Sequence, residues 1–161
     1  MKSYRLLYNF IAVISLVPVL YLLVSLPDKT LCQVPAPWKY LMLAGQAVSA
    51  LFLIVAVLQT DILSFAGLRQ LVEEEEVGNL VTNGLYSSVR HPLYTFSLMI
   101  LWFSPAMSMN SFIIYAVLTI YVLIGIFFEE RKLLREFGQA YEQYKSVTPM
   151  LIPALKLRGN K

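Results

Sequence analysis

The sequence predicts an all-α integral membrane protein, and three observations support this prediction. Hydrophobic residues make up 58% of the 161 residues. Charged residues make up 14%, whereas soluble domains contain about 25%. The hydrophobic residues also fall into long uncharged runs, as in membrane-spanning helices. We therefore expect one domain, residues 1–161, with about four transmembrane helices, the last two forming a helical hairpin, and a cytoplasmic amphipathic helix near the C-terminal end.

Composition argues against several classes of site and partner. The chain has one histidine and one cysteine, so we expect neither a metal site nor a disulfide. The net charge of +3 is compatible with nucleic-acid binding in principle. However, the basic residues lie beside hydrophobic runs, as membrane topology requires. We therefore expect membrane lipid as a partner and no nucleic acid.

The first part of the chain, residues 1–60, predicts two spans. Residues 6–26 form a run of 21 residues without a charge, which crosses roughly 30 Å as a helix. The run is too long for the apolar part of a signal peptide and has no small-residue cleavage site after it, so we interpret it as a retained anchor. The second span covers residues 40–60, after a proline-containing loop. It carries small residues that favour close helix packing, namely Gly45, Ala47, Ser49 and Ala50.

Residues 61–92 form a polar loop, and residues 93–128 form the predicted hairpin. The loop contains four adjacent glutamates, residues 73–76, which are typical of a solvated surface; a gating role for them stays open. The hairpin is apolar except for SPAMSMNS at residues 104–111. Non-helical backbone at membrane depth requires shelter from lipid, so we expect this turn near the far membrane surface or buried in protein.

The last part of the chain, residues 129–161, predicts a helix that continues from the hairpin into water. Its apolar residues recur at spacings of 3, 4 and 3, which indicates an amphipathic helix. This stripe consists of Leu134, Phe137, Tyr141 and Tyr144. Prolines 149 and 153 end the helix, and a basic tail follows.

The distribution of positive charge predicts the orientation in the membrane. With four crossings, 11 of the 13 lysines and arginines fall on one side, and only Lys29 and Lys39 fall on the other. The positive-inside rule places the richer side in the cytoplasm. We therefore expect a multi-pass protein of a bacterial inner membrane, with both termini, the long loop and the functional site cytoplasmic.

A candidate site begins where the third span begins. Arg90 and His91 precede the span, Pro92 suits its first turn, and Tyr94 lies one turn after Arg90. We expect unpaired backbone N–H groups near His91 and Tyr94, which a ligand carboxylate or phosphate would bind. The alternative is that Arg90 extends to lipid headgroups and His91 only caps the helix.

Glu129 and Glu130 mark the end of the fourth span. They directly follow an apolar run of 17 residues, and charge at the bilayer boundary is costly and typical of function. The structural alternative is that one of them pairs with Arg131, Lys132 or Arg90. The functional interpretation is that Glu129 faces a ligand near His91, while Glu130 pairs with a base such as Arg90.

Three motifs in this order resemble a known superfamily. They are VTNGLYSSVRHPLY, FFEERKLLREFGQAYEQY and TPMLIP, spread over residues 81–153. The set resembles the isoprenylcysteine carboxyl methyltransferase and phospholipid methyltransferase superfamily, integral membrane enzymes that use S-adenosyl-L-methionine. The segments DILSFAGLRQL and LWFSPAMSMN are similar to the bacterial thiol S-methyltransferase branch. The chain contains no glycine-rich phosphate-binding fingerprint of the soluble nucleotide-binding folds.

The resemblance implies a helical S-adenosyl-L-methionine site and roles for particular residues. By position, the cofactor-binding residues are Asn79, Leu80, Val81, Tyr86, His91, Pro92, Leu93, Tyr94 and Glu129. The catalytic residues are His91 and Arg90. Whether His91 acts as a base or only positions the cofactor stays open.

The resemblance leaves the methyl acceptor undecided. In the prenylcysteine enzymes an arginine stands one turn before the first glutamate, where this chain has Gly125, so a carboxylate acceptor is less well provided for. A thiol, an isoprenylcysteine-like carboxylate and a phospholipid amine are the candidates, each a lipophilic or membrane-delivered molecule entering from the cytoplasmic leaflet. The alternative function is a non-catalytic membrane scaffold or a small-molecule-binding protein with the same fold.

Overall fold

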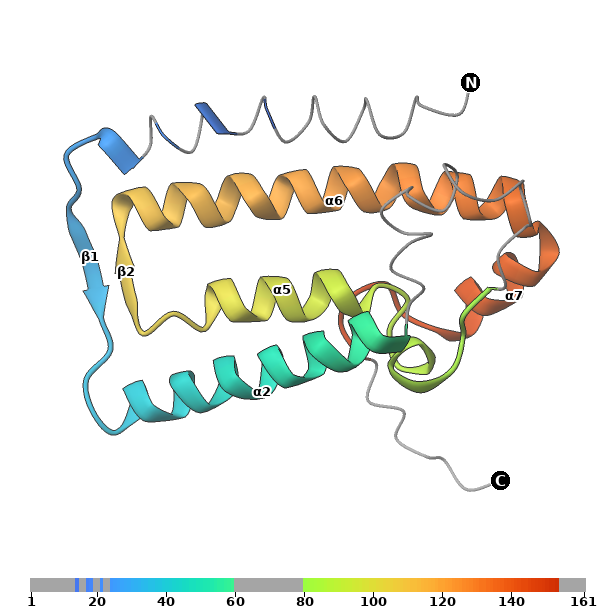
Figure 1. Cartoon of the computed structure of the whole chain (residues 1–161), viewed down its shortest axis with the longest axis horizontal. Coiled ribbons are helices and arrows are strands. Elements are labelled where there is room, and N and C mark those ends of the chain that lie inside the picture. The colour runs from blue at the N-terminus through green and yellow to red at the C-terminus, as the bar shows by residue number, and fades with distance from the viewer. Residues whose placement is uncertain (1–13, 15–16, 19–20, 22–23, 60–79, 154–161) are drawn as a thin grey trace.

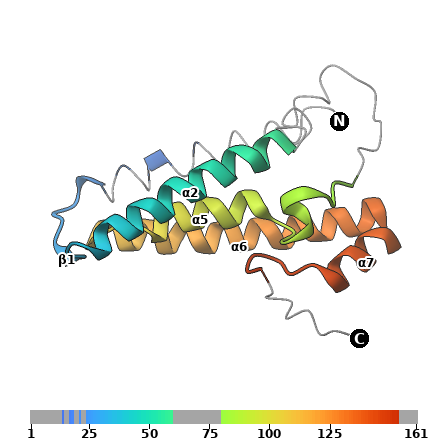
Figure 2. The ribbon, with the colours of Figure 1, turned by 90° about the horizontal axis from the view of Figure 1, so that it is seen from below.

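The computed structural model describes residues 14, 17–18, 21, 24–59 and 80–153. The elements in chain order are β1 (Thr30–Gln33), α2 (Trp38–Gln59), the short 3-10 helix η1 (Gly84–Ser87), α5 (Pro92–Trp102), β2 (Ala106–Ser108), α6 (Met109–Phe137) and α7 (Gln139–Val147). The predicted, mostly helical fold is confirmed. Figure 1 shows β1 and β2 at one end of the long helices and α7 at the other, and Figure 2 shows β1 and α7 at these two ends from a second direction.

Two of the described helices are long and apolar enough to cross a bilayer. These are α2, with 22 residues, and α6, with 29. Helix α5 has 11 residues, fewer than the 17 or so that a complete crossing needs. The first predicted span, residues 6–26, lies largely outside the described residues. Four complete crossings therefore stay a prediction.

Helix α2 packs along α5 through one face of small and aromatic side chains. Ser49 and Ala56 are fully buried, and the Phe52 ring stacks on Phe96 with centroids 5.1 Å apart. Gly45 continues this face, since it lies one turn before Ser49 on the helix. The predicted role of small residues in close packing is thus confirmed at Ser49.

Gly45→Ala is expected to lower the free energy of unfolding by about 1–3 kcal/mol, because the added methyl overfills this face. A Cβ at Gly45 would lie 2.6 Å from Cδ2 of Phe103, whereas a Cβ at Gly125 would meet nothing within 4 Å among the described residues. Gly125→Ala is therefore the matched control, and its gain in helix propensity should stabilise the chain slightly. Thermal unfolding in detergent measures both, and equal stabilisation by the two changes would contradict the prediction.

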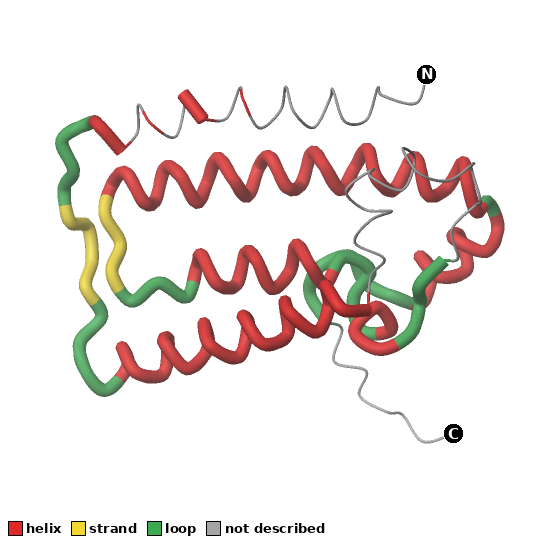
Figure 3. The backbone as a smooth tube through the Cα atoms, viewed as in Figure 1, coloured by secondary structure: helices red, strands yellow, loops and turns green. Residues whose placement is uncertain are grey.

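The two-stranded sheet is a feature that the sequence did not predict. β1 and β2 pair antiparallel, with Thr30 opposite Ser108 and Gln33 opposite Ala106 (Figure 3). Beside the sheet, the carbonyl of Pro105 in the turn accepts a hydrogen bond from the Val34 amide at 2.9 Å. The backbone of the hairpin turn is therefore satisfied by the loop before α2, as non-helical backbone near a membrane requires.

The predicted amphipathic helix is divided in two at Gly138. This residue has a φ of 52°, a conformation that glycine adopts without steric cost. The division separates the predicted apolar stripe: Leu134 on α6 is 39% exposed, whereas Tyr141 and Tyr144 on α7 are buried. The prediction of one continuous helix is wrong, because the turn at Gly138 lets α7 fold back and pack by itself.

Candidate active site

The start of α5 is held by the segment that follows α7, residues 148–151. Arg90 N donates to Pro149 O at 2.8 Å, His91 N donates to Met150 O at 3.2 Å, and the Thr95 hydroxyl donates to Leu151 O at 2.9 Å. The expectation of a free N–H at His91 is therefore wrong. The reason is tertiary, since the chain itself supplies the acceptor at this helix start.

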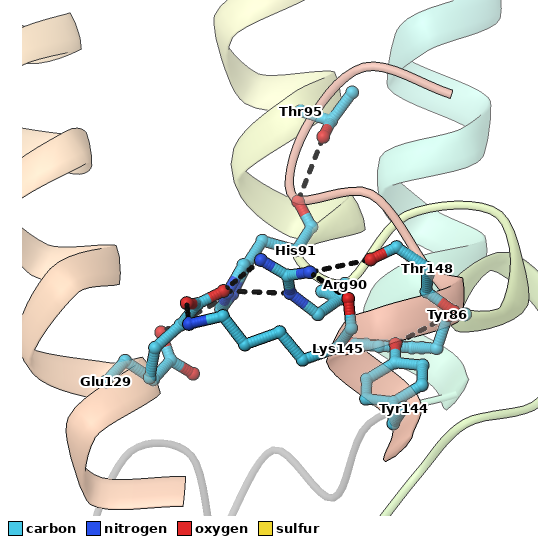
Figure 4. A network of polar contacts seen from close by, with 9 residues as sticks. Tyr86, Arg90, His91, Thr95, Glu129, Tyr144, Lys145 and Thr148 are labelled. Carbon is cyan, nitrogen blue, oxygen red and sulfur yellow. Dashed lines mark hydrogen bonds and ion pairs between the residues drawn. The ribbon is translucent and has the colours of Figure 1, made fainter. Parts of the chain in front are cut away.

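A partly buried ion-pair cluster joins the start of α5 to α6 and α7 (Figure 4). The Arg90 guanidinium contacts Oε1 of Glu130 through Nε at 2.8 Å and Nη2 at 2.6 Å. Nζ of Lys145 contacts the other oxygen of Glu130 at 2.9 Å. The remaining Arg90 nitrogen donates to the carbonyls of Lys145 at 3.1 Å and Thr148 at 2.6 Å. The expected pairing of Glu130 with Arg90 is confirmed.

His91, Glu129 and Tyr94 meet beside this cluster. Nδ1 of His91 lies 3.9 Å from Oε2 of Glu129, and the His91 and Tyr94 ring centroids are 5.8 Å apart. The Tyr94 side chain also interacts with the Glu129 carboxylate. Among the described residues, Glu129 has no arginine or lysine partner, and its side chain is 30% exposed. Glu129 is therefore the carboxylate of this site that remains accessible to a ligand.

Burial sets the protonation of His91. The residue is 5% exposed, and burial lowers the pKa of its imidazole below 6.5. Arg90 acts in the same direction, while the carboxylates of Glu129 and Glu130 oppose it. The imidazole is therefore neutral at pH 7 and keeps one nitrogen lone pair.

This depressed pKa predicts lower stability in mild acid. Below a pH of about 6.5 the unfolded chain binds a proton at His91 that the folded chain does not. The free energy of unfolding should therefore fall as the pH falls, by at most about 1.4 kcal/mol per pH unit. Thermal unfolding between pH 7.5 and 5.5 measures this slope, and His91→Gln should flatten it. Stability that rises on acidification would mean that the carboxylates hold His91 charged.

The other predicted site residues that the structure describes lie at the start of α5, in η1 and in the segment before η1. Pro92 is buried at the first position of α5, and Leu93 beside it is half-buried. The backbone carbonyl of Tyr86 accepts a hydrogen bond from the Tyr144 hydroxyl at 2.6 Å. Leu80 and Val81 lie in the segment before η1. Asn79 lies outside the described residues.

Sequence reasoning missed Lys145 and Thr148 as members of the cluster. Lys145 follows Tyr141 by four residues in α7, so it lies one turn along the same face. That spacing could have predicted that Lys145 lies on the same side of the helix as Tyr141. Thr148 contributes only its backbone carbonyl to Arg90, which no side-chain pattern can reveal.

The fold and the cluster define a helical protein with candidate membrane spans and a polar site at one end of the bundle. The chain belongs to the family described as "Protein of unknown function (DUF1295)", whose profile matches residues 1–148. No solved structure matches the chain.

Several curated relatives are named as thiol methyltransferases. The chain is 34% identical over 128 residues to "Methanethiol S-methyltransferase" of Crocosphaera subtropica, a match covering 72% of this chain and 50% of the relative. It is 45% identical over 69 residues to "Methanethiol S-methyltransferase 1" of Bradyrhizobium diazoefficiens, covering 43% and 24%. It is 39% identical over 79 residues to "Methanethiol S-methyltransferase" of Pseudomonas deceptionensis, covering 49% and 30%.

These matches confirm the resemblance to the thiol S-methyltransferase branch of the membrane methyltransferases. In these three matches the chain spans half or less of the relative's own length.

Proposed function

We propose that this protein transfers a methyl group from S-adenosyl-L-methionine to a small, lipophilic thiol at the cytoplasmic leaflet of a membrane. The observation that carries the proposal is the meeting of His91, Glu129 and Tyr94 at one end of the bundle. The names of the relatives support transfer to a thiol. The four-span topology, with the site on the cytoplasmic side, is part of this proposal.

The side chains present suit this methyl donor. The accessible carboxylate of Glu129 can accept hydrogen bonds from ribose hydroxyls or from the ammonium of the amino-acid portion. The Tyr94 ring offers cation–π attraction to a sulfonium, worth about 0.5–2 kcal/mol. The buried Nε2 of His91 has no hydrogen-bond partner among the described residues, although Oε1 of Glu130 lies 3.4 Å away. When bound, the donor would supply an electrophilic methyl group on its sulfonium.

The residues of the chain then have two tasks. The first is to align the thiol sulfur with the methyl carbon and to exclude water, which contributes up to about 7–11 kcal/mol to lowering the barrier. The second arises only if the thiol arrives protonated. In that case the neutral imidazole of His91 would accept the thiol proton as the sulfur takes up the methyl group. Arg90 supports both tasks by holding Glu130 and the start of α5 in place.

The lack of a cation at Gly125 favours a thiol over a carboxylate acceptor, and this position also offers open space. Gly125 lies one turn before Glu129 on α6 and is half-buried. Tyr121 lies one turn before Gly125, and Tyr94 interacts with both Tyr121 and Glu129. A Cβ at Gly125 would meet none of the described atoms within 4 Å. We propose that the acceptor reaches the site through this space between α5 and α6.

Gly125→Leu is expected to reduce kcat/KM for the thiol by about 10–200-fold, because its side chain occupies the acceptor path. Gly125→Ala should have a smaller effect, since a single methyl leaves most of the space open. Cofactor affinity should be unchanged in both variants. Steady-state kinetics with a thiol series measures this, and a leucine variant with normal kcat/KM would place the acceptor path elsewhere.

The proposed function is tested by identifying the methylated product. The purified full chain is incubated with S-adenosylmethionine labelled in its methyl group and with a thiol, an isoprenylcysteine or a phospholipid amine, and the products are analysed by mass spectrometry. We expect label on the thiol sulfur. Label on the carboxylate or amine would refute the acceptor, and absence of both product and saturable cofactor binding would favour a non-catalytic scaffold.

A further inference from the structure

Tyr141 carries a buried hydroxyl that nothing in the described protein satisfies. The residue lies on α7 and is 1% exposed. Its hydroxyl has no hydrogen-bond partner among the described residues. In that part of the chain, the only other buried side-chain nitrogen or oxygen without a partner is Nε2 of His91. Most buried polar atoms in proteins have a partner, and an orphaned donor destabilises the fold. A phenylalanine would fill the same space without that cost.

A second tyrosine on the same helix provides a comparison. Tyr144 is also buried, and the two tyrosine rings lie edge to face with centroids 6.0 Å apart. The Tyr144 hydroxyl donates to the carbonyl of Tyr86 at 2.6 Å, which ties α7 to η1. Packing and anchoring of α7 therefore account for the hydroxyl of Tyr144 and leave that of Tyr141 without a structural role.

The surroundings of Tyr141 make its hydroxyl a donor. Burial raises the pKa of Tyr141, the carboxylates of Glu130 and Glu129 add to this rise, and Arg90 opposes it. The phenol therefore stays protonated at neutral pH. The nearby Glu130 already accepts from Arg90 at one oxygen and from Lys145 at the other. The Tyr141 hydroxyl therefore has a hydrogen to donate and no hydrogen-bond acceptor among the described residues.

Lys145 adds a second donor on the same face of α7. It lies one turn after Tyr141, and its half-exposed ammonium makes a 2.9 Å contact with Glu130. An ammonium has three N–H donors, so it can bind another anionic group. Tyr141 and Lys145 together therefore match a carboxylate, whereas Glu129 across the site matches hydroxyls or an ammonium.

We propose that Tyr141 is a ligand-positioning residue whose hydroxyl donates a hydrogen bond to the carboxylate of the bound methyl donor, with Lys145 beside it. This inference rests on the proposed function. It assigns the unpaired hydroxyl on α7 to binding rather than to folding.

The test compares Tyr141→Phe with the matched control Tyr144→Phe in the detergent-purified full chain. Thermal unfolding without ligand is measured first. Tyr141→Phe should unfold at the same temperature as the wild type or higher, because it removes an unsatisfied donor. Tyr144→Phe should unfold at a lower temperature, because it removes the hydrogen bond from the Tyr144 hydroxyl to the Tyr86 carbonyl.

Affinity is then measured by calorimetry with two ligands. S-adenosylhomocysteine carries the amino-acid carboxylate, whereas 5′-methylthioadenosine keeps the adenosine and sulfur but lacks that group. Tyr141→Phe should weaken S-adenosylhomocysteine binding by about 10-fold or more, as expected for a lost hydrogen bond to a charged group. Binding of 5′-methylthioadenosine should be unchanged.

Two outcomes overturn the role of Tyr141 and leave the proposed function standing. One is wild-type affinity of Tyr141→Phe for S-adenosylhomocysteine. The other is an equal loss for both ligands, which would mean that the hydroxyl only supports the shape of the site. A wild-type chain that binds neither ligand refutes the proposed function, and this inference with it.

Discussion

Replacing Arg90 with methionine is expected to lower the free energy of unfolding by about 3–5 kcal/mol, the range found when one member of a buried ion pair is removed. The Arg90 and Glu130 side chains are only 8% and 12% exposed. Arg90 also holds the carbonyls of Lys145 and Thr148. Its loss therefore leaves a carboxylate with one remaining cation and releases the segment that packs on α5.

The same variant decides between two roles for Arg90. Thermal unfolding in detergent measures the loss of stability, and Lys132→Met is the matched control. Lys132 pairs with Glu136 on the surface of α6 at 3.7 Å, and such exposed pairs contribute at most about 1 kcal/mol. Unfolding of Arg90→Met at the wild-type temperature, together with loss of activity, would contradict a positioning role and return Arg90 to direct catalysis.

Glu129→Gln is expected to weaken binding of S-adenosylmethionine by about 10–100-fold, because hydrogen bonds to a charged acceptor are worth about 1.5–3 kcal/mol. The amide keeps the size and one acceptor oxygen of the carboxylate but loses its charge. The variant should fold normally, since the Glu129 side chain is 30% exposed and pairs with no lysine or arginine in the described part of the chain.

A second glutamate on α6 serves as the control for this change. Glu136 is 31% exposed, close to the exposure of Glu129, and it pairs with Lys132 away from His91. Calorimetry should show wild-type cofactor affinity for Glu136→Gln and weakened affinity for Glu129→Gln. Equal affinities for the two variants would remove Glu129 from the proposed cofactor site.

The sequence was sufficient to predict that His91 and Glu129 meet. An apolar hairpin connects the start of α5 to the polar end of α6. Because the chain turns back in the hairpin, its two ends lie at the same end of the helices. The structure places the two side chains 3.9 Å apart. The pairing of Glu130 with Arg90 followed from the same reasoning, because adjacent residues on a helix point about 100° apart.

The sequence was not sufficient to predict how α7 packs. The apolar spacing from Leu134 to Tyr144 is continuous, and it predicted one helix. The turn at Gly138 depends on a backbone conformation that glycine permits but does not require. The contacts that hold α7 in place include the hydrogen bond from Tyr144 to Tyr86, and they come from residues far away in the sequence.

By itself, the sequence determined the helical character of the chain and the residues that gather at one end of it. Hydrophobic periodicity and the placing of charges act locally, so they can be read along the chain. Only the tertiary structure decided the pairing of β1 with β2, the acceptor that occupies the His91 amide, and the unpaired hydroxyl of Tyr141. These features depend on contacts between groups far apart in the sequence, and the pattern of side chains along the chain does not predict such contacts.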